Sequence, residues 1–317
     1  MKQRDHIRRT GELPREAKSD IEAQLETARE ILGDENVYGP EQIAKVWHVD
    51  LDPQDIPPIP FSPHELEKAK ELGMMLILRI SHDKDHNPLT GSHMRELLQP
   101  RFDTEGRGKL FYDNMGWDYQ NEPFFTSEIP VRSPPSLHSR RIRRSLETKE
   151  DFASLEDDAL HAEWKLLSRD ILPNSTSKNY LNQTKLLRDT LSSQGWLTDE
   201  EAEEVTDEKL KALEPLVTSN VEVEWKKAAE LLSNLKINQR HRRTFSQSLY
   251  DTVTVYLADL ENNPATRRPL EGKYDWGVSR SSDGSLVNFG NFVSVGASVS
   301  GWDPGGGDGF LGVVFAR

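Results

Sequence analysis

A short acidic stretch that also contains histidines has the residue types of a cation site. Asp83, Asp85 and Asn87 match the first three ligand positions of a helix–loop–helix calcium loop. Such a loop needs glycine at its sixth position and a bidentate glutamate at its twelfth, and this chain has Pro88 and Met94 there. Because both substitutions remove what calcium requires, the calcium interpretation is rejected.

Three histidines in the same stretch, His82, His86 and His93, are near enough in sequence to share a metal ion. The chain has 9 histidines among 317 residues, so such proximity arises easily by chance. We favour a solvated loop, and we expect neither a metal site nor a cofactor.

The sequence DPGGGDG at 303–309 places Asp303 and Asp308 among glycines. It is a single copy with the wrong order for the calcium-binding nonapeptide repeat. No Gly-Lys-Ser/Thr follows it, so it is not a phosphate-binding loop. A flexible surface loop is the expectation.

Two basic runs, SRRIRRS at 139–145 and QRHRR at 239–243, are typical of solvated helix faces that pair with neighbouring acids. Local RNA binding is the alternative. The whole chain has 40 basic and 53 acidic residues and a net charge of −13, whereas phosphate contacts need a positive field. We therefore expect no nucleic-acid partner.

The chain has no cysteine, which excludes disulfides, thiolate zinc sites and a cysteine nucleophile. It has no G-x-S-x-G elbow, no H-E-x-x-H motif and no Walker loop. No catalytic residue can be assigned, and we expect a protein that is not an enzyme.

Apolar spacing predicts the elements that would position these residues. In the first half we expect helices at 14–32, after 40, at 63–73 and at 92–98, with strands at 74–80 and 109–112. A proline-rich connector covers 53–63, and the polar segment 130–158 is read as an exposed insertion with a helical stretch.

The second half is expected to be helical after a short strand at 164–167. Helices are predicted at 178–191, 200–213, 222–235 and 244–260, and strands at 274–279, 286–292, 297–302 and 311–315. The predicted class is α+β. A helical and mixed α/β region at 1–160 precedes a domain at 161–317 with a small antiparallel sheet and long Gly-rich loops.

The last 37 residues, 281–317, have an unusual composition. They hold nine of the 20 glycines and contain no Lys, Glu, Gln or Met. They also lack Thr, Ile, Tyr and His.

An aromatic-rich strand with Tyr274 and Trp276, the turn SSDG at 281–284 and the closing strand LGVVFAR at 311–317 carry a resemblance. This layout resembles C-type lectin folds of the formylglycine-generating-enzyme type, and especially the C-termini of variable proteins of diversity-generating retroelements. Through PNSTSKNYLNQT at 173–184 and WKKAAELLSNLKIN at 225–238, the whole chain is similar to uncharacterised proteins of candidate bacterial phyla.

The resemblance implies mutagenesis at template adenines, which cannot produce Lys, Glu, Gln, Met or Trp from asparagine codons. Trp302 would then belong to the fixed scaffold. The missing Thr, Ile, Tyr and His remain unexplained by this route, and Gly-rich loops also disfavour Lys and Glu.

The resemblance also implies a division of roles in the tail. Scaffold residues would anchor strands in the core; they are Trp276, Trp302, Leu311, Val313 and Phe315. Variable residues would project from loops and the outer sheet face to bind ligand; they are Ser285, Val293, Val295, Ser298, Ser300, Gly301, Asp303, Gly305, Gly306, Gly307, Asp308 and Phe310.

The function expected from this resemblance is a non-enzymatic ligand-binding protein whose lectin-like surface is diversified to bind varied ligands. Because the variable residues have small side chains and include apolar ones, the expected partner is a protein. Two alternatives stay open: a formylglycine-generating-enzyme-like protein with an unknown enzymatic role, and a phage or intracellular scaffold protein without a diversified site.

The first ten residues are charged and contain no apolar stretch, so no signal peptide is visible. The longest apolar run, residues 74–78, is too short to span a bilayer. We expect a soluble cytoplasmic protein, with association with a phage particle or a surface left open.

Overall fold

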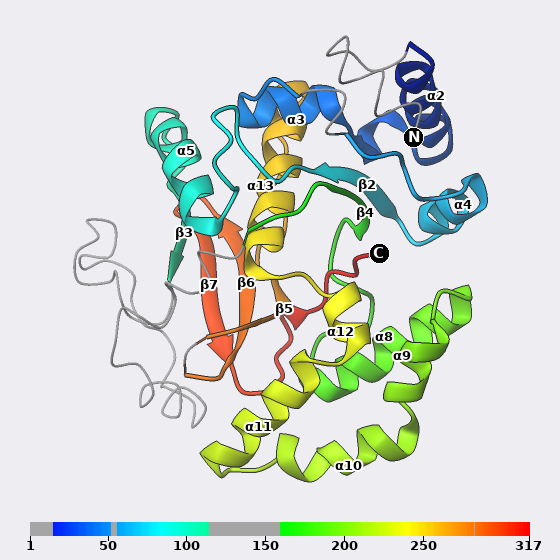
Figure 1. The fold of residues 1–317 in the computed structure, drawn as a ribbon. Coiled ribbons are helices and arrows are strands. Elements are labelled where there is room, and N and C mark those ends of the chain that lie inside the picture. The colour runs from blue at the N-terminus through cyan, green and yellow to red at the C-terminus, as the bar shows by residue number, and fades with distance from the viewer. Residues whose placement is uncertain (1–14, 52–55, 114–158, 282) are drawn as a thin grey trace.

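The computed structural model describes residues 15–51, 56–113, 159–281 and 283–317 (Figure 1). Both helices and strands are abundant, so the chain is of the α+β class, as predicted. The predicted insertion 130–158, the basic run 139–145 and part of the connector 53–63 lie outside the described residues. No helix in the described ranges is both long enough and apolar enough to cross a membrane.

The predicted helices of the first half are present, and local capping explains where they begin. The elements are α2 (Arg15–Leu32), η1 (Asp34–Asn36), α3 (Pro40–Trp47), α4 (Pro63–Glu71) and α5 (Gly91–Thr104). At α4, the Ser62 hydroxyl accepts the Glu65 N–H while the Glu65 carboxylate accepts the Ser62 N–H. This capping box satisfies donors that the first helical turn leaves unpaired.

A three-stranded sheet has the order β1-β2-β4. Its strands are β1 (Val37–Tyr38), β2 (Met74–Arg79) and β4 (Glu163–Ser168). β1 runs parallel to β2, and β4 is antiparallel to it with Leu76 opposite Leu166. All six residues of β2 are buried, which explains its continuous run of apolar residues.

The helical second half is more divided than the sequence predicts. Its helices are α8 (Tyr180–Gln194), α9 (Asp199–Glu204), α10 (Asp207–Val217), α11 (Glu222–Ser233), α12 (Lys236–His241) and α13 (Phe245–Asn262). The single helix predicted at 200–213 is two helices, because the Thr206 side chain caps a new one by accepting the Lys209 N–H. Likewise, the helix predicted at 222–235 ends at Ser233.

Helix α13 lies at the centre of the molecule, between the two sheets (Figure 1). Every residue from Phe245 to Ala258 is buried except Gln247. Phe245 packs on Phe289 of the second sheet, and Tyr250 donates to the carbonyl oxygen of Leu78 in the first. Burial on all sides therefore outweighs the weak helix propensity of its Thr and Val residues.

The second sheet has the order β3-β7-β6-β5-β8. Its strands are β3 (Lys109–Asp113), β5 (Tyr274–Arg280), β6 (Leu286–Val293), β7 (Gly296–Trp302) and β8 (Leu311–Gly312). Its three inner strands are antiparallel, but β3 joins β7 and β8 joins β5 in parallel. The sheet is therefore mixed rather than purely antiparallel, because both edge strands, β3 and β8, run parallel to their neighbours.

The predicted boundary at residue 160 does not divide the structure. β2 pairs with β4, and β3 pairs with β7, so segments from both sides of the boundary share both sheets. The buried apolar residues also form one continuous core. Segments on the two sides of residue 160 therefore belong to the same two sheets and to the same core.

The C-terminal segment connects the two sheets. Leu311 pairs with Tyr274 of β5, and six residues later Arg317 exchanges two backbone hydrogen bonds of 2.8 Å with Leu166 of β4. The strand predicted at 311–315 is therefore only Leu311–Gly312 in the structure, because the chain then leaves the second sheet to reach the first.

Candidate functional site

The residues assigned to the scaffold lie mostly in the interior. Trp276, Leu311, Val313 and Phe315 are buried, and Trp276 packs perpendicular to Tyr180 of α8 with ring centroids 5.1 Å apart. Trp302 is only half-buried. Its ring reaches the surface at the end of β7, so it contributes to the core and to the surface together.

Four of the residues assigned to a variable surface are buried. Ser298 has no exposed surface, and Ser285 is 6% exposed. Ser285 turns inward because its hydroxyl and N–H both donate to Asp283, at 3.0 and 2.9 Å. Gly301 and Gly306 are also buried. The expectation that these four project into solvent is wrong.

The remaining variable positions form two separate groups. Val293 and Val295 lie half-exposed in the turn between β6 and β7. The second group lies at the opposite end of β7 and in the loop after it; its members are Ser300, Asp303, Gly305, Gly307, Asp308 and Phe310. Because β7 has seven residues, the groups are about 20 Å apart. A single compact ligand cannot contact all residues of both groups at once.

Phe310, a member of the second group, contacts two further aromatic rings, and we call Tyr274, Trp302 and Phe310 the aromatic trio. The Phe310 ring centroid lies 5.6 Å from that of Tyr274 and 6.4 Å from that of Trp302. Phe310 is 38% exposed, and the other two rings are half-buried. The trio therefore places apolar area at the surface on a frame that the sheet supports.

The β7–β8 loop, residues 303–310, is held in place by its main-chain carbonyl groups. The N–H of Ser177 donates to the Asp308 carbonyl oxygen at 2.7 Å, and the N–H of Tyr180 donates to that of Pro304 at 3.0 Å. The Tyr274 N–H donates to the Phe310 carbonyl oxygen at 2.8 Å. Since these anchors are backbone atoms, they do not depend on which side chains the loop carries.

Two loop glycines predicted to vary are fixed by steric contact. A Cβ atom at Gly305 would lie 2.3 Å from the Val217 carbonyl oxygen, and one at Gly306 would lie 2.6 Å from the Trp302 ring. At Gly307 the nearest backbone atom, in Lys178, would be 3.0 Å away. Substitution at the first two positions requires the loop to move, so the replaceable surface is smaller than the sequence predicts.

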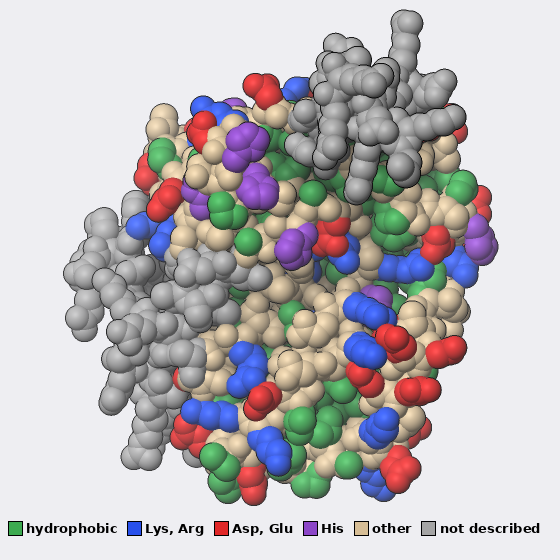
Figure 2. Space-filling model, in the orientation of Figure 1, with side chains coloured by type: hydrophobic (Ala, Val, Ile, Leu, Met, Phe, Trp, Pro, Cys, Tyr) green, Lys and Arg blue, Asp and Glu red, His purple; other side chains and the backbone are tan. Residues whose placement is uncertain are grey.

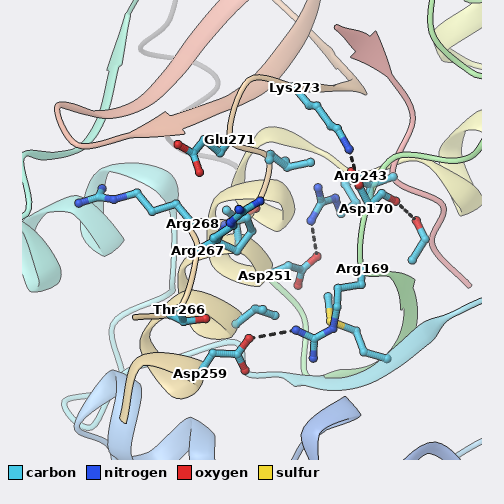
Figure 3. A pocket seen from close by; sticks show the side chains of 17 residues that line it. Arg169, Asp170, Arg243, Asp251, Asp259, Thr266, Arg267, Arg268, Glu271 and Lys273 are labelled. Carbon is cyan, nitrogen blue, oxygen red and sulfur yellow. Dashed lines mark hydrogen bonds and ion pairs between the residues drawn. The ribbon is translucent and has the colours of Figure 1, made fainter. Parts of the chain in front are cut away.

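A polar pocket of about 860 Å³ lies where α13, the end of β4 and residues 266–273 meet (Figure 3). Both charge signs line it: the cations are Arg169, Arg243, Arg267, Arg268 and Lys273, and the anions are Asp170, Asp251, Asp259 and Glu271. Apolar side chains complete the lining; they are Met75, Val255, Pro269, Leu270 and Val314.

The floor of the pocket is a buried charge network. Asp251 on α13 accepts from Arg79 through both carboxylate oxygens, at 3.0 and 2.8 Å, and from Arg243 at 3.4 Å. Arg243 also donates to Asp275 at 2.8 Å. Burial acts to lower the pKa of Arg79, but Asp251 and Glu163 raise it above its ordinary value. The Arg79 guanidinium therefore stays charged.

A second cluster forms the side of the pocket. Arg169 donates to Asp259 at 2.9 Å and to the Tyr38 hydroxyl at 2.7 Å, while that hydroxyl donates to Asp259 at 2.7 Å. Burial, the largest influence, raises the pKa of Tyr38 above its ordinary value. Both oxygens of Asp259 are therefore occupied by donors from the protein.

The sequence did not indicate this pocket, although part of it lies in a run that we singled out. QRHRR at 239–243 was expected to be a solvated helix face. Instead Arg242 and Arg243 are 1% and 2% exposed, and the Arg242 guanidinium lies 3.7 Å from the Tyr180 ring centroid. The prediction holds for the start of the run, because Gln239 and Arg240 are exposed and Arg240 pairs with Glu200 and Glu201. Arg243 also pairs with acids, but the expected solvation is wrong for Arg242 and Arg243 because the run ends inside the core.

The acidic loop considered for calcium is closed by hydrogen bonds of its own. Asp83 accepts the N–H groups of Asp85 and Asn87, both at 2.8 Å, and lies 2.7 Å from His93 Nε2. Burial acts to raise the pKa of Asp83, but these bonds lower it well below its usual range. Within the described ranges, no group of three or more metal-binding side chains occurs.

Figure 2 shows acidic and basic side chains interspersed over the face formed by the lower helices, without a large basic area. Comparisons of the chain with protein families, with curated proteins and with solved structures give no match.

Proposed function

We propose that the protein binds other proteins through the surface formed by the aromatic trio and the β7–β8 loop. In this proposal the protein is a variable protein of a diversity-generating retroelement. Residues 161–317 are its C-type-lectin-like part. The observation that carries the proposal is Phe310: its ring is exposed between Tyr274 and Trp302, on a loop anchored through backbone carbonyl groups.

The loop anchoring supports diversification in particular. A scaffold that presents replaceable side chains must keep its backbone when those side chains change. Asp308 and Phe310 meet this condition, since each is anchored by its carbonyl oxygen and has a side chain at the surface. Ser300 and Asp303 are half-exposed beside them.

The pairing of β4 with the C-terminal residues supports the lectin-like interpretation. A domain that begins near residue 161 and ends at residue 317 has its two ends side by side, since Leu166 and Arg317 are hydrogen-bonded. The helices α8 to α13 would form the α portion of this domain. The described part of residues 1–160 would then supply three further strands, β1, β2 and β3, and a helical layer.

The exposed aromatic rings favour a protein partner. Aromatic side chains at a surface supply contact area at low entropic cost and are enriched at sites that dominate binding energy. Asp303 and Asp308 lie beside the trio, in a chain with a net charge of −13. This local and overall acidity opposes binding of nucleic acid. A cytoplasmic location remains an expectation.

The genomic locus provides the first test. We expect a near-copy of codons 281–317 close to the gene, with asparagine codons at the exposed positions, together with a reverse transcriptase gene. A complete locus that lacks both would refute diversification.

A display library tests the binding surface directly. Randomising Ser300, Asp303, Asp308 and Phe310 in the full chain should yield binders to an unrelated folded protein such as lysozyme. An equally large library at four positions of the opposite turn, Asn291, Val293, Ser294 and Val295, is the control. The binding proposal fails if the first library, shown to be folded, yields no more binders than the second.

A further inference from the structure

The polar pocket has more hydrogen-bond donors than it uses. Among its carboxylates, Asp251 and Asp259 accept protein donors through both oxygens. Asp170 does so as well, from the Ile171 N–H and from Lys273. The three aspartates therefore have no oxygen that lacks a donor, and a ligand would meet them as neutralised groups.

The cations divide into committed and uncommitted groups. Arg243, Arg169 and Lys273 each pair with one or more of these carboxylates or with Asp275. By contrast, in the described part of the chain Arg267 forms no hydrogen bond or ion pair, although it lines the pocket and is exposed at its opening.

Arg268 contributes further unused donors. Its Nη2 donates to the Arg107 carbonyl oxygen at 2.9 Å, and its guanidinium lies 4.7 Å from the Phe292 ring centroid. Its Nη1 is buried and has no hydrogen-bond partner among the described residues. An unpaired buried donor is costly. Because this atom is closed off from solvent, a ligand acceptor would pair with it only after the Arg268 side chain shifts toward the cavity. Glu271, which is exposed, is an opposing charge near enough to act on Arg268.

We propose that this pocket binds a small phosphorylated organic molecule, whose phosphate contacts Arg267 and Arg268. A guanidinium presents several N–H groups in the geometry that phosphate oxygens accept. Figure 3 shows Arg267 and Arg268 on the side of the pocket opposite Arg169 and Arg243, so cationic residues line the cavity on both sides.

The size and the apolar lining account for the organic part of the ligand. A volume of about 860 Å³ is far larger than a phosphate ion needs and falls in the range of small-molecule sites. Val255, Leu270 and Met75 are buried side chains that line the same cavity, and they would contact carbon atoms of the ligand. This binding would not involve the aromatic trio.

Isothermal titration calorimetry of the full chain with inorganic phosphate, at constant ionic strength, tests the proposal. We expect saturable binding with a Kd of about 1 mM or tighter. Arg267→Ala should weaken it about tenfold or more, since a hydrogen bond between charged groups is lost. Arg267 has no hydrogen-bond or ion-pair partner among the residues that the structure describes, so this variant should unfold at the wild-type temperature.

Two controls make the result decisive. Lys211→Ala removes one exposed positive charge from α10 and should leave phosphate binding unchanged. Succinate, at the same ionic strength, tests whether any dianion is accepted. Absence of saturable phosphate binding, equal binding by the Arg267 variant, an equal loss in the Lys211 variant or equal affinity for succinate would each overturn the proposal.

Discussion

Arg79 and Asp251 form a fully buried, two-point ion pair between residues that are 172 positions apart in the sequence. Arg79 is the last residue of β2, and Asp251 lies on α13. The pair joins the three-stranded sheet to the central helix, and through Arg243 it also reaches Asp275 of the second sheet. One charge network therefore connects the three main layers of the molecule.

Replacing Asp251 tests how much this network matters. Asp251→Asn leaves two buried guanidinium groups with one carboxylate fewer, so we expect the free energy of unfolding to fall by about 3–5 kcal/mol. Urea denaturation of the variant measures this. The double variant Arg79→Met/Asp251→Leu removes both charges and should recover part of the lost free energy of unfolding. If Asp251→Asn lowers the free energy of unfolding by less than about 1 kcal/mol, the ion pair is unimportant for stability.

Glu201 predicts a pH dependence of stability. Burial acts to raise its pKa, but hydrogen bonds from His241 and Thr198 lower the pKa from 4.5 to about 2. A folded-state pKa below the unfolded one means that the stabilisation is complete above about pH 5 and is lost as the pH falls toward 2. Glu201→Gln should therefore be less stable than wild type at pH 7, with a difference that shrinks between pH 5 and pH 2.

Urea denaturation from pH 2 to pH 7 measures the Glu201 effect. Glu203→Gln, on the same short helix but with an exposed side chain, is the matched control and should follow the wild-type curve. A constant difference between Glu201→Gln and wild type across this range would contradict the assignment.

The loop glycines separate fixed from replaceable positions. Gly306→Ala forces a Cβ atom against the Trp302 ring, so we expect a loss of about 1–3 kcal/mol in the free energy of unfolding. Gly309→Ala is the control, because its Cβ atom would meet nothing nearer than Ser177 Oγ at 4.0 Å. Thermal unfolding of both compares them; equal melting temperatures would mean that the loop moves freely and is not a fixed frame.

Ser298 tests whether a buried position can belong to a variable surface. Its hydroxyl is buried and has no hydrogen-bond partner among the described residues. Ser298→Ala removes that unpaired group and should raise the free energy of unfolding by about 1 kcal/mol. Ser298→Asn, a change that template mutagenesis allows, should lower it. If Ser298→Asn is as stable as wild type, Ser298 can be a variable residue despite its burial.

Local sequence signals predicted most elements but not their partners. The start of α4 is evident from Ser62, Pro63 and Glu65, because capping involves residues within one turn. By contrast, nothing in residues 109–113 indicates that β3 joins β7, a strand almost 200 positions later. This pairing brings segments from both sides of residue 160 into one sheet.

The candidate sites show the same limit. The tail composition directed attention to residues 281–317, and Phe310 does lie at the surface there. Burial of Ser298 and crowding at Gly305 could not be predicted, because they depend on β6, α10 and Trp302 as neighbours. The pocket was missed because its lining comes from β2, β4, α13 and two C-terminal segments, which no spacing rule connects.

The sequence by itself determined the α+β class, the positions of most helices and strands, the acidic charge and the absence of cysteine chemistry. These follow from periodicity, capping and composition, which act over a few residues or over the chain as a whole. Only the tertiary structure decided which strands pair, which arginines are buried and which tail side chains reach the surface. Those outcomes depend on contacts between distant segments, whose energies exist only once the core has formed.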